Sequence, residues 1–89
     1  MALALVAYDL KRPGQDYPDL IKKLESYPRH WHMQQSVWLV TLSGSEYDLA
    51  NELEGYLDEN DKLFVTRVSS SAAWSGYSEK VSEWLHRNL

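Results

Sequence analysis

Asp9 is the residue best placed for chemistry, because it directly follows an apolar run at residues 2–8. A run of seven residues, closed by a charge and then by Pro13-Gly14, is typical of a strand buried on both faces. The carboxylate would leave the core at the strand tip. Mg²⁺ and Mn²⁺ prefer oxygen ligands and keep several waters, so Asp9 residues from two subunits can hold one ion that activates water near a phosphodiester. Alternatively, Asp9 ends the strand and accepts hydrogen bonds from the next loop.

A second group of polar residues, Gln34, Gln35 and Ser36, stands just ahead of another strand-like run. Their amide and hydroxyl groups are able to contact phosphate. Such residues also satisfy backbone groups at a strand bend or fix a dimer contact, and this interpretation is favoured. Ser36 is nevertheless a second candidate catalytic residue. Gln34 is a candidate nucleic-acid contact, together with Lys11 and Arg12 in the loop after the first strand.

His30 and His32 are two residues apart, so on a strand both side chains would point to the same side. A structural zinc site needs about four ligands, and no third ligand stands nearby in the sequence. Partly exposed or pH-sensing histidines are therefore favoured, with His32 as a base near phosphate as a lesser alternative. Four tryptophans offer surfaces on which bases can stack. Few cations stand between them, which favours packing in the core or at a dimer interface.

The remaining pattern supplies the elements that position these residues. It predicts a helix that Asp16 caps and Pro28 ends, strands at 31–34 and 37–42, a helix that begins with a capping box at Ser45 and Asp48, and a strand at 62–69. The acidic turn at 58–61 is expected to be solvated, and residues 69–73 form a polar connector or a further edge strand. A final helix, capped by Ser78, is expected to run to Asn88. The order β-α-β-β-α-β predicts an α+β protein with the ferredoxin-like sandwich and an extra C-terminal helix.

Composition limits the class of protein. A length of 89 residues corresponds to a single domain, residues 1–89, and the absence of cysteine excludes disulfides and thiolate metal sites. Nine basic residues stand against thirteen acidic ones, which argues against a strong DNA-coating role because phosphate neutralisation supplies most non-specific affinity. The longest apolar run is far below the roughly 18 residues that span a bilayer, and no signal-peptide pattern is present. We therefore expect a cytoplasmic protein with no membrane partner.

Two motifs in register resemble the Cas2 family of small CRISPR-associated proteins. In that family an apolar strand closes on Tyr-Asp-Leu/Ile, matched by Tyr8-Asp9-Leu10, and a Gln-x-Ser-Val-aromatic segment is matched by residues 34–38. The resemblance runs from residue 2 to about residue 69. It implies a ferredoxin-like homodimer in which Asp9 is associated with a divalent metal at the dimer interface and, in some members, with nuclease activity. Other members clamp DNA beside an integrase.

Together these observations predict a Cas2-like homodimer that acts on or beside RNA or DNA, with Mg²⁺ or Mn²⁺ as its cofactor. Three functions remain open. The first is a metal-dependent endonuclease that uses Asp9 and Ser36. The second is a non-catalytic dimer that scaffolds a partner, such as an integrase, or holds a small nucleotide. The third is a toxin-type ribonuclease on the same fold.

Overall fold

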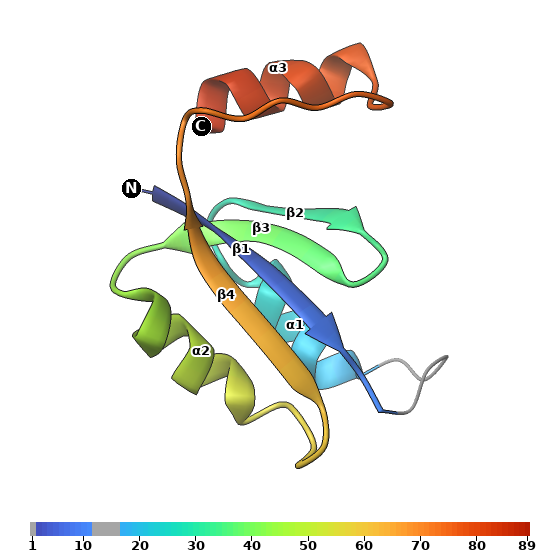
Figure 1. Ribbon diagram of the computed structural model, residues 1–89, viewed down its shortest axis with the longest axis vertical. Coiled ribbons are helices and arrows are strands. Elements are labelled where there is room, and N and C mark those ends of the chain that lie inside the picture. Colours follow the sequence, from blue (N-terminus) through green and yellow to red (C-terminus); the bar gives the residue numbers. More distant parts are fainter. Residues whose placement is uncertain (1, 12–16) are drawn as a thin grey trace.

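The computed structural model describes residues 2–11 and 17–89. Its elements are β1 (Ala2–Asp9), α1 (Pro18–Glu25), β2 (His30–Gln34), β3 (Val37–Leu42), α2 (Glu46–Glu54), β4 (Lys62–Val68) and α3 (Glu79–Asn88) (Figure 1). The order of these elements is the one that the sequence predicts. Residues 69–73 form no strand, so the edge-strand alternative for this segment is wrong.

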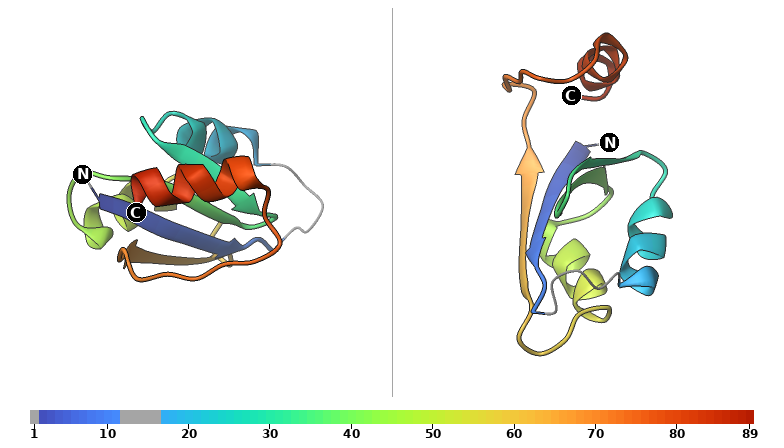
Figure 2. Two further views of the ribbon diagram at one scale, coloured as in Figure 1. Left: turned by 90° about the horizontal axis from the view of Figure 1, so that it is seen from above. Right: turned by 90° about the vertical axis from the view of Figure 1, so that its right-hand side faces the viewer.

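Four strands form one antiparallel sheet in the order β2-β3-β1-β4. β1 is central, because it pairs with both β3 and β4, and its backbone groups therefore find partners on both sides. Figure 2 shows α3 separated from α1 and α2 by the sheet. The protein thus has three layers over part of the sheet, and both faces of β1 meet a helical layer. None of the helices in the described part of the chain is long and apolar enough to cross a membrane.

Alternate residues of β1 enter two separate cores, as the pleat of a strand requires. The first core holds Ala4, Val6 and Tyr8, and it is completed by leucines from α1 and α2, namely Leu20, Leu24, Leu49 and Leu53. The second core holds Leu3, which packs with Leu39 of β3 and Leu85 of α3. This arrangement explains why the β1 sequence is a continuous apolar run rather than an alternating one.

The two helices of the first layer begin and end for local reasons. α2 begins with the predicted capping box, in which Ser45 Oγ accepts the N–H of Asp48 and Asp48 Oδ2 accepts the N–H of Ser45. α1 ends at Glu25, earlier than expected from Pro28, and both the hydroxyl and the backbone N–H of the following Ser26 bond to the carbonyl of Lys23. Asp16, the predicted cap of α1, lies outside the described residues.

α3 covers only part of the second sheet face. Its Val81, Trp84 and Leu85 pack on the second core, and the Trp31 ring of β2 lies 5.9 Å from the Trp84 ring. Toward the end of β1 and the start of β4, the same face is left without a helical cover. Its side chains there are Ala7, Val37 and Thr66, all half-buried, and Phe64, which is 63% exposed. We call these four residues the open patch.

Candidate functional site at the end of β1

Asp9 occupies the tip of β1, where its side chain is exposed. The sheet register pairs it with Lys62 of β4, so the carboxylate and the ammonium lie on the same face of two adjacent strands. The Asp9 side chain has no hydrogen-bond or ion-pair partner within residues 2–11 and 17–89. The alternative interpretation, in which Asp9 accepts hydrogen bonds from the next loop, concerns residues 12–16, which lie outside the described part of the chain.

The sheet brings Ser36 close to Asp9. Ser36 lies in the turn between β2 and β3, and its carbonyl accepts the backbone N–H of Tyr8 at 3.1 Å. Ser36 therefore stands one residue from Asp9 across the end of the sheet. Lys11 is exposed two residues after Asp9, and Arg12 lies outside the described residues.

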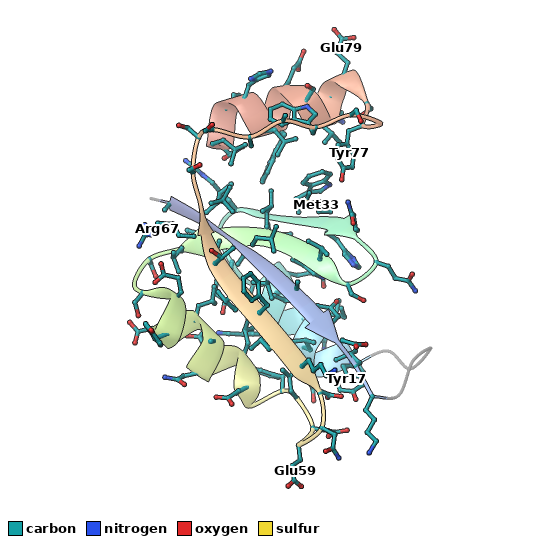
Figure 3. The ribbon with its side chains drawn as sticks, in the orientation of Figure 1. Tyr17, Met33, Glu59, Arg67, Tyr77 and Glu79 are labelled. Atoms are coloured by element: carbon teal, nitrogen blue, oxygen red, sulfur yellow. The ribbon has the colours of Figure 1, made fainter. Side chains whose placement is uncertain are left out.

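Gln34 is engaged elsewhere. A register shift between His32 and Gln34 turns the end of β2, and the Gln34 amide donates to the Tyr77 hydroxyl at 3.1 Å. Figure 3 shows Tyr77 between the start of α3 and the sheet, close to Met33. The Gln34 side chain is thus bonded to the C-terminal segment. Gln34, which we expect to contact nucleic acid, is therefore not part of one group with Asp9.

The acidic turn at 58–61 is structural as well as solvated. Asp61 Oδ1 accepts the backbone N–H of Lys11 at 2.7 Å and the Tyr17 hydroxyl at 3.3 Å, and its Oδ2 accepts the N–H of Asp58 at 2.8 Å. One carboxylate thus joins the end of β1 to the approach to α1 and to the start of β4. Only the local bond to the N–H of Asp58 could be expected from the sequence, because an Asp that bonds to a nearby backbone N–H is a common turn device.

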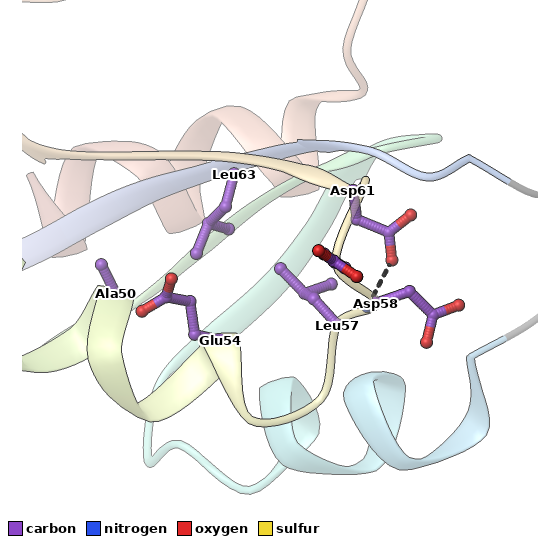
Figure 4. A pocket seen from close by; sticks show the side chains of 7 residues that line it. Ala50, Glu54, Leu57, Asp58, Asp61 and Leu63 are labelled. Carbon is purple, nitrogen blue, oxygen red and sulfur yellow. Dashed lines mark hydrogen bonds between the residues drawn. The ribbon is translucent and has the colours of Figure 1, made fainter.

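Two hollows flank this end of the sheet. The larger, of about 610 Å³, has four carboxylates among its lining residues, which are Ala50, Glu54, Leu57, Asp58, Glu59, Asp61 and Leu63 (Figure 4). This concentration of negative charge disfavours phosphate there. The smaller, of about 250 Å³, is lined by Ala7, Tyr8, Asp9, Lys62, Leu63 and Phe64. It joins Asp9 directly to the open patch.

Within residues 2–11 and 17–89, a single copy does not assemble a Mg²⁺ or Mn²⁺ site at Asp9. Among the residues that the structure describes, no group of three or more His, Cys, Asp or Glu side chains is placed to hold a metal. Asp9 offers one carboxylate, and its neighbour Lys62 is a cation. In the predicted metal site, a second copy of Asp9 supplies the further carboxylate.

The two histidines of β2 lie on the same side of the strand, as predicted. The rings of His30 and His32 lie 6.4 and 4.2 Å from the Trp38 ring, measured between centroids. Each histidine has one ring nitrogen beside a backbone carbonyl: His30 Nδ1 beside Tyr27, and His32 Nε2 beside Gln35. The zinc interpretation thus gains no third ligand from the described part of the fold.

The residue before Asp9 anchors the site in the first core. The buried Trp38 indole donates its Nε1–H to the Tyr8 hydroxyl at 3.2 Å. Burial raises the pKa of the Tyr8 phenol, and the hydrogen bond from Trp38 opposes this shift. The phenol is therefore protonated at neutral pH, and Tyr8 acts as a fixed neutral anchor beside Asp9.

No protein-family model matches this chain, and no solved structure matches it well enough to indicate a relative.

Proposed function

We propose that this protein is a Cas2-like homodimer with the ferredoxin-like fold, acting on or beside nucleic acid in the cytoplasm. The strand order β2-β3-β1-β4 supports this fold, because two interlocked split βαβ units give that order with both crossover helices on one face. The resemblance of residues 8–10 and 34–38 to the family motifs supports the assignment.

The observation that carries the proposal is the open patch beside Asp9. Phe64 is 63% exposed on a sheet face that is covered elsewhere by α3, and it lines the same hollow as Asp9. An exposed apolar surface on a sheet is characteristic of an interaction site. In a twofold contact the same patch serves both copies, so the two Asp9 carboxylates meet at the rim of one interface.

In the leading form of the proposal, the paired Asp9 carboxylates hold Mg²⁺ or Mn²⁺. The ion, when bound, would supply charge neutralisation and an activated water for phosphodiester hydrolysis. Ser36 stands one residue away across the sheet end and is available to contact phosphate through its hydroxyl.

A specific observation favours the second candidate, a non-catalytic dimer that scaffolds an integrase-type partner or holds a small nucleotide. Lys62 is paired with Asp9 in the sheet register, so a cation already stands beside the carboxylate. An ammonium in this position competes with a divalent ion and contacts a phosphate as a point charge.

Dimer formation tests the shared part of both candidates. Sedimentation velocity is expected to show a dimer for the native chain and a monomer for Phe64→Asp, because the substitution places a charge in the contact. Tyr47→Asp is the matched control, since Tyr47 is 80% exposed and belongs to α2, in the layer on the opposite side of the sheet. A native monomer, or equal dimerisation of both variants, would contradict the proposal.

Hydrolysis of single-stranded RNA or DNA with added Mg²⁺ or Mn²⁺ separates the two candidates. The catalytic form predicts activity that is lost in Asp9→Asn and kept in Asp19→Asn, which removes an exposed acid from α1. Equal activity in native protein and Asp9→Asn would reject Asp9 as the metal ligand. A dimer that binds nucleic acid without cleaving it supports the scaffold.

A further inference from the structure

The edge strand β2 lies in the part of the chain that is free of acids. No Asp or Glu occurs between Glu25 and Glu46, although the chain has thirteen acidic residues and a net charge of −4. This segment holds Arg29, His30 and His32, and β2 pairs only with β3, so its other edge lies at the margin of the sheet. A polyanion therefore meets less repulsion along this edge than beside the acidic hollow at α2.

His32 presents a flat and fixed ring at this edge. It stacks on the Trp38 indole with a centroid separation of 4.2 Å and an angle of 14° between the planes. Trp38 is 2% exposed, whereas the His32 side chain is exposed, so the ring face away from Trp38 is turned to solvent. Because His32 Nε2 is also held by the Gln35 carbonyl at 3.1 Å, little side-chain freedom is lost when a second planar group stacks on it.

Arg29, which directly precedes β2, supplies an unpaired cation near the same edge. Its backbone is fixed, since its N–H donates to Thr41 Oγ1 at 2.8 Å and its carbonyl accepts the N–H of Thr41 at 2.9 Å. Its exposed guanidinium has no partner among the residues described. Arg29 stands one residue before β2 and three residues before His32, and extended chain rises about 3.3 Å per residue, so both lie within about 10 Å of each other along this edge.

We propose that this edge is the binding track for single-stranded nucleic acid, with a base stacked on His32 and a phosphate held by Arg29. Bases stack on any flat aromatic surface, and guanidinium groups match the geometry of phosphate oxygens. The track rests on the proposed function and extends it. It leads through the turn that contains Ser36 to the end of the sheet at Asp9, because the Ser36 carbonyl is bonded to the N–H of Tyr8.

Binding without metal tests the track separately from catalysis. The probe is a short labelled oligouridine or oligothymidine in EDTA, with affinity measured by fluorescence anisotropy over a range of salt concentrations. His32→Leu is expected to weaken binding about tenfold, within the range of stacking effects per base. His32→Tyr keeps a flat ring and is expected to bind within about twofold of the native protein.

The arginine arm of the test uses the salt dependence. Arg29→Ala is expected to lower the slope of log K against log salt by about 0.7, the value for one phosphate contact on a single strand. Arg67→Ala is the matched control, because it removes the same charge from β4 at the opposite edge of the sheet, and it should leave the slope unchanged. This arm decides the question even if His32→Leu fails to fold, as judged by circular dichroism.

The outcomes separate the track from the proposed function. Native binding that His32→Leu and Arg29→Ala leave unchanged overturns the track and leaves a nucleic-acid role intact. Equal affinity for a duplex of the same length also overturns it, because duplex bases cannot stack on His32. Absence of any salt-sensitive binding by the native protein overturns both proposals together.

Discussion

Replacing Tyr8 by Phe tests how the first core fixes the position of Asp9. The substitution removes the acceptor for the Trp38 Nε1–H, a bond of 3.2 Å between residues that are 9% and 2% exposed. Every buried side-chain polar atom in the described chain has a partner, so Tyr8→Phe would create an unsatisfied one. We expect a loss of about 1–3 kcal/mol in the free energy of unfolding, because a buried donor without an acceptor costs its full desolvation. The melting temperature should fall by about 4–8 °C for each kcal/mol.

Urea unfolding followed by far-ultraviolet circular dichroism measures this loss without relying on tryptophan emission, which the substitution itself alters. Tyr47→Phe is the control, because its side chain is 80% exposed and its change should stay within about 0.5 kcal/mol. Equal stabilities for the two variants would refute the reasoning.

The pKa of Tyr8 gives the same test a pH dependence. Since burial raises the pKa of the folded-state phenol above its ordinary value of 10.0, folding favours the protonated form. The resulting stability is full below pH 10 and is lost as the pH rises through the folded-state pKa. The difference between native protein and Tyr8→Phe should therefore shrink in alkali and stay constant near neutrality.

Three further predictions concern the layer formed by α1 and α2. Leu53→Ala should cost about 2–5 kcal/mol in urea unfolding, because Leu53 is 0% exposed in the first core; a loss below 1 kcal/mol would contradict that packing. Ser45→Ala should lower the free energy of unfolding by about 1 kcal/mol through loss of the capping box, and Ser45→Asp should restore most of that loss. Unfolding followed by circular dichroism measures both variants. The pKa of the Glu52 carboxyl is lowered, first by the hydrogen bond from Lys23 and then by that from Tyr27. The contribution of Glu52 to the stability of the fold is therefore present above the unfolded-state pKa and is lost as the pH falls through the folded-state pKa. The native protein should consequently lose its small advantage over Glu52→Gln in acid, and an advantage that grows in acid would reverse the assigned sign.

The parts of the fold that the sequence predicts are those set by local rules. The apolar run ahead of Asp9 indicated a strand covered on both faces, because it is short and is closed by a charge and a Pro-Gly turn. Ser45 and Asp48 fixed the start of α2, and Ser78 fixed the start of α3, because each cap bonds within three residues of itself. Ser36 came close to Asp9 because strand order alone brings their backbones together.

The parts that escaped prediction depend on contacts distant in sequence. Asp61 bonds to Lys11, fifty residues away, and nothing in the acidic turn indicates which N–H its carboxylate will accept. Gln34 bonds to Tyr77 because α3 folds back over β2, which no periodicity within the last helix reveals. A residue pattern defines an apolar helical face, but it does not identify the surface that this face covers.

The position of α3 limits the sheet surface that is available for contact in the proposed dimer. A face-to-face contact over the whole sheet is blocked where Trp84 and Leu85 pack on the second core, so a second copy meets only the open patch and its rim. Stable interfaces bury about 800 Å² on each partner, an area that four side chains on three strands cannot supply alone. We therefore expect the contact to extend to Asp9 and Lys62, which line the hollow beside Phe64 and form the rim of the proposed interface. We expect the proposed dimer of this limited area to concentrate its energy in Phe64, the large exposed ring of the open patch, so the residue at position 64 should decide assembly.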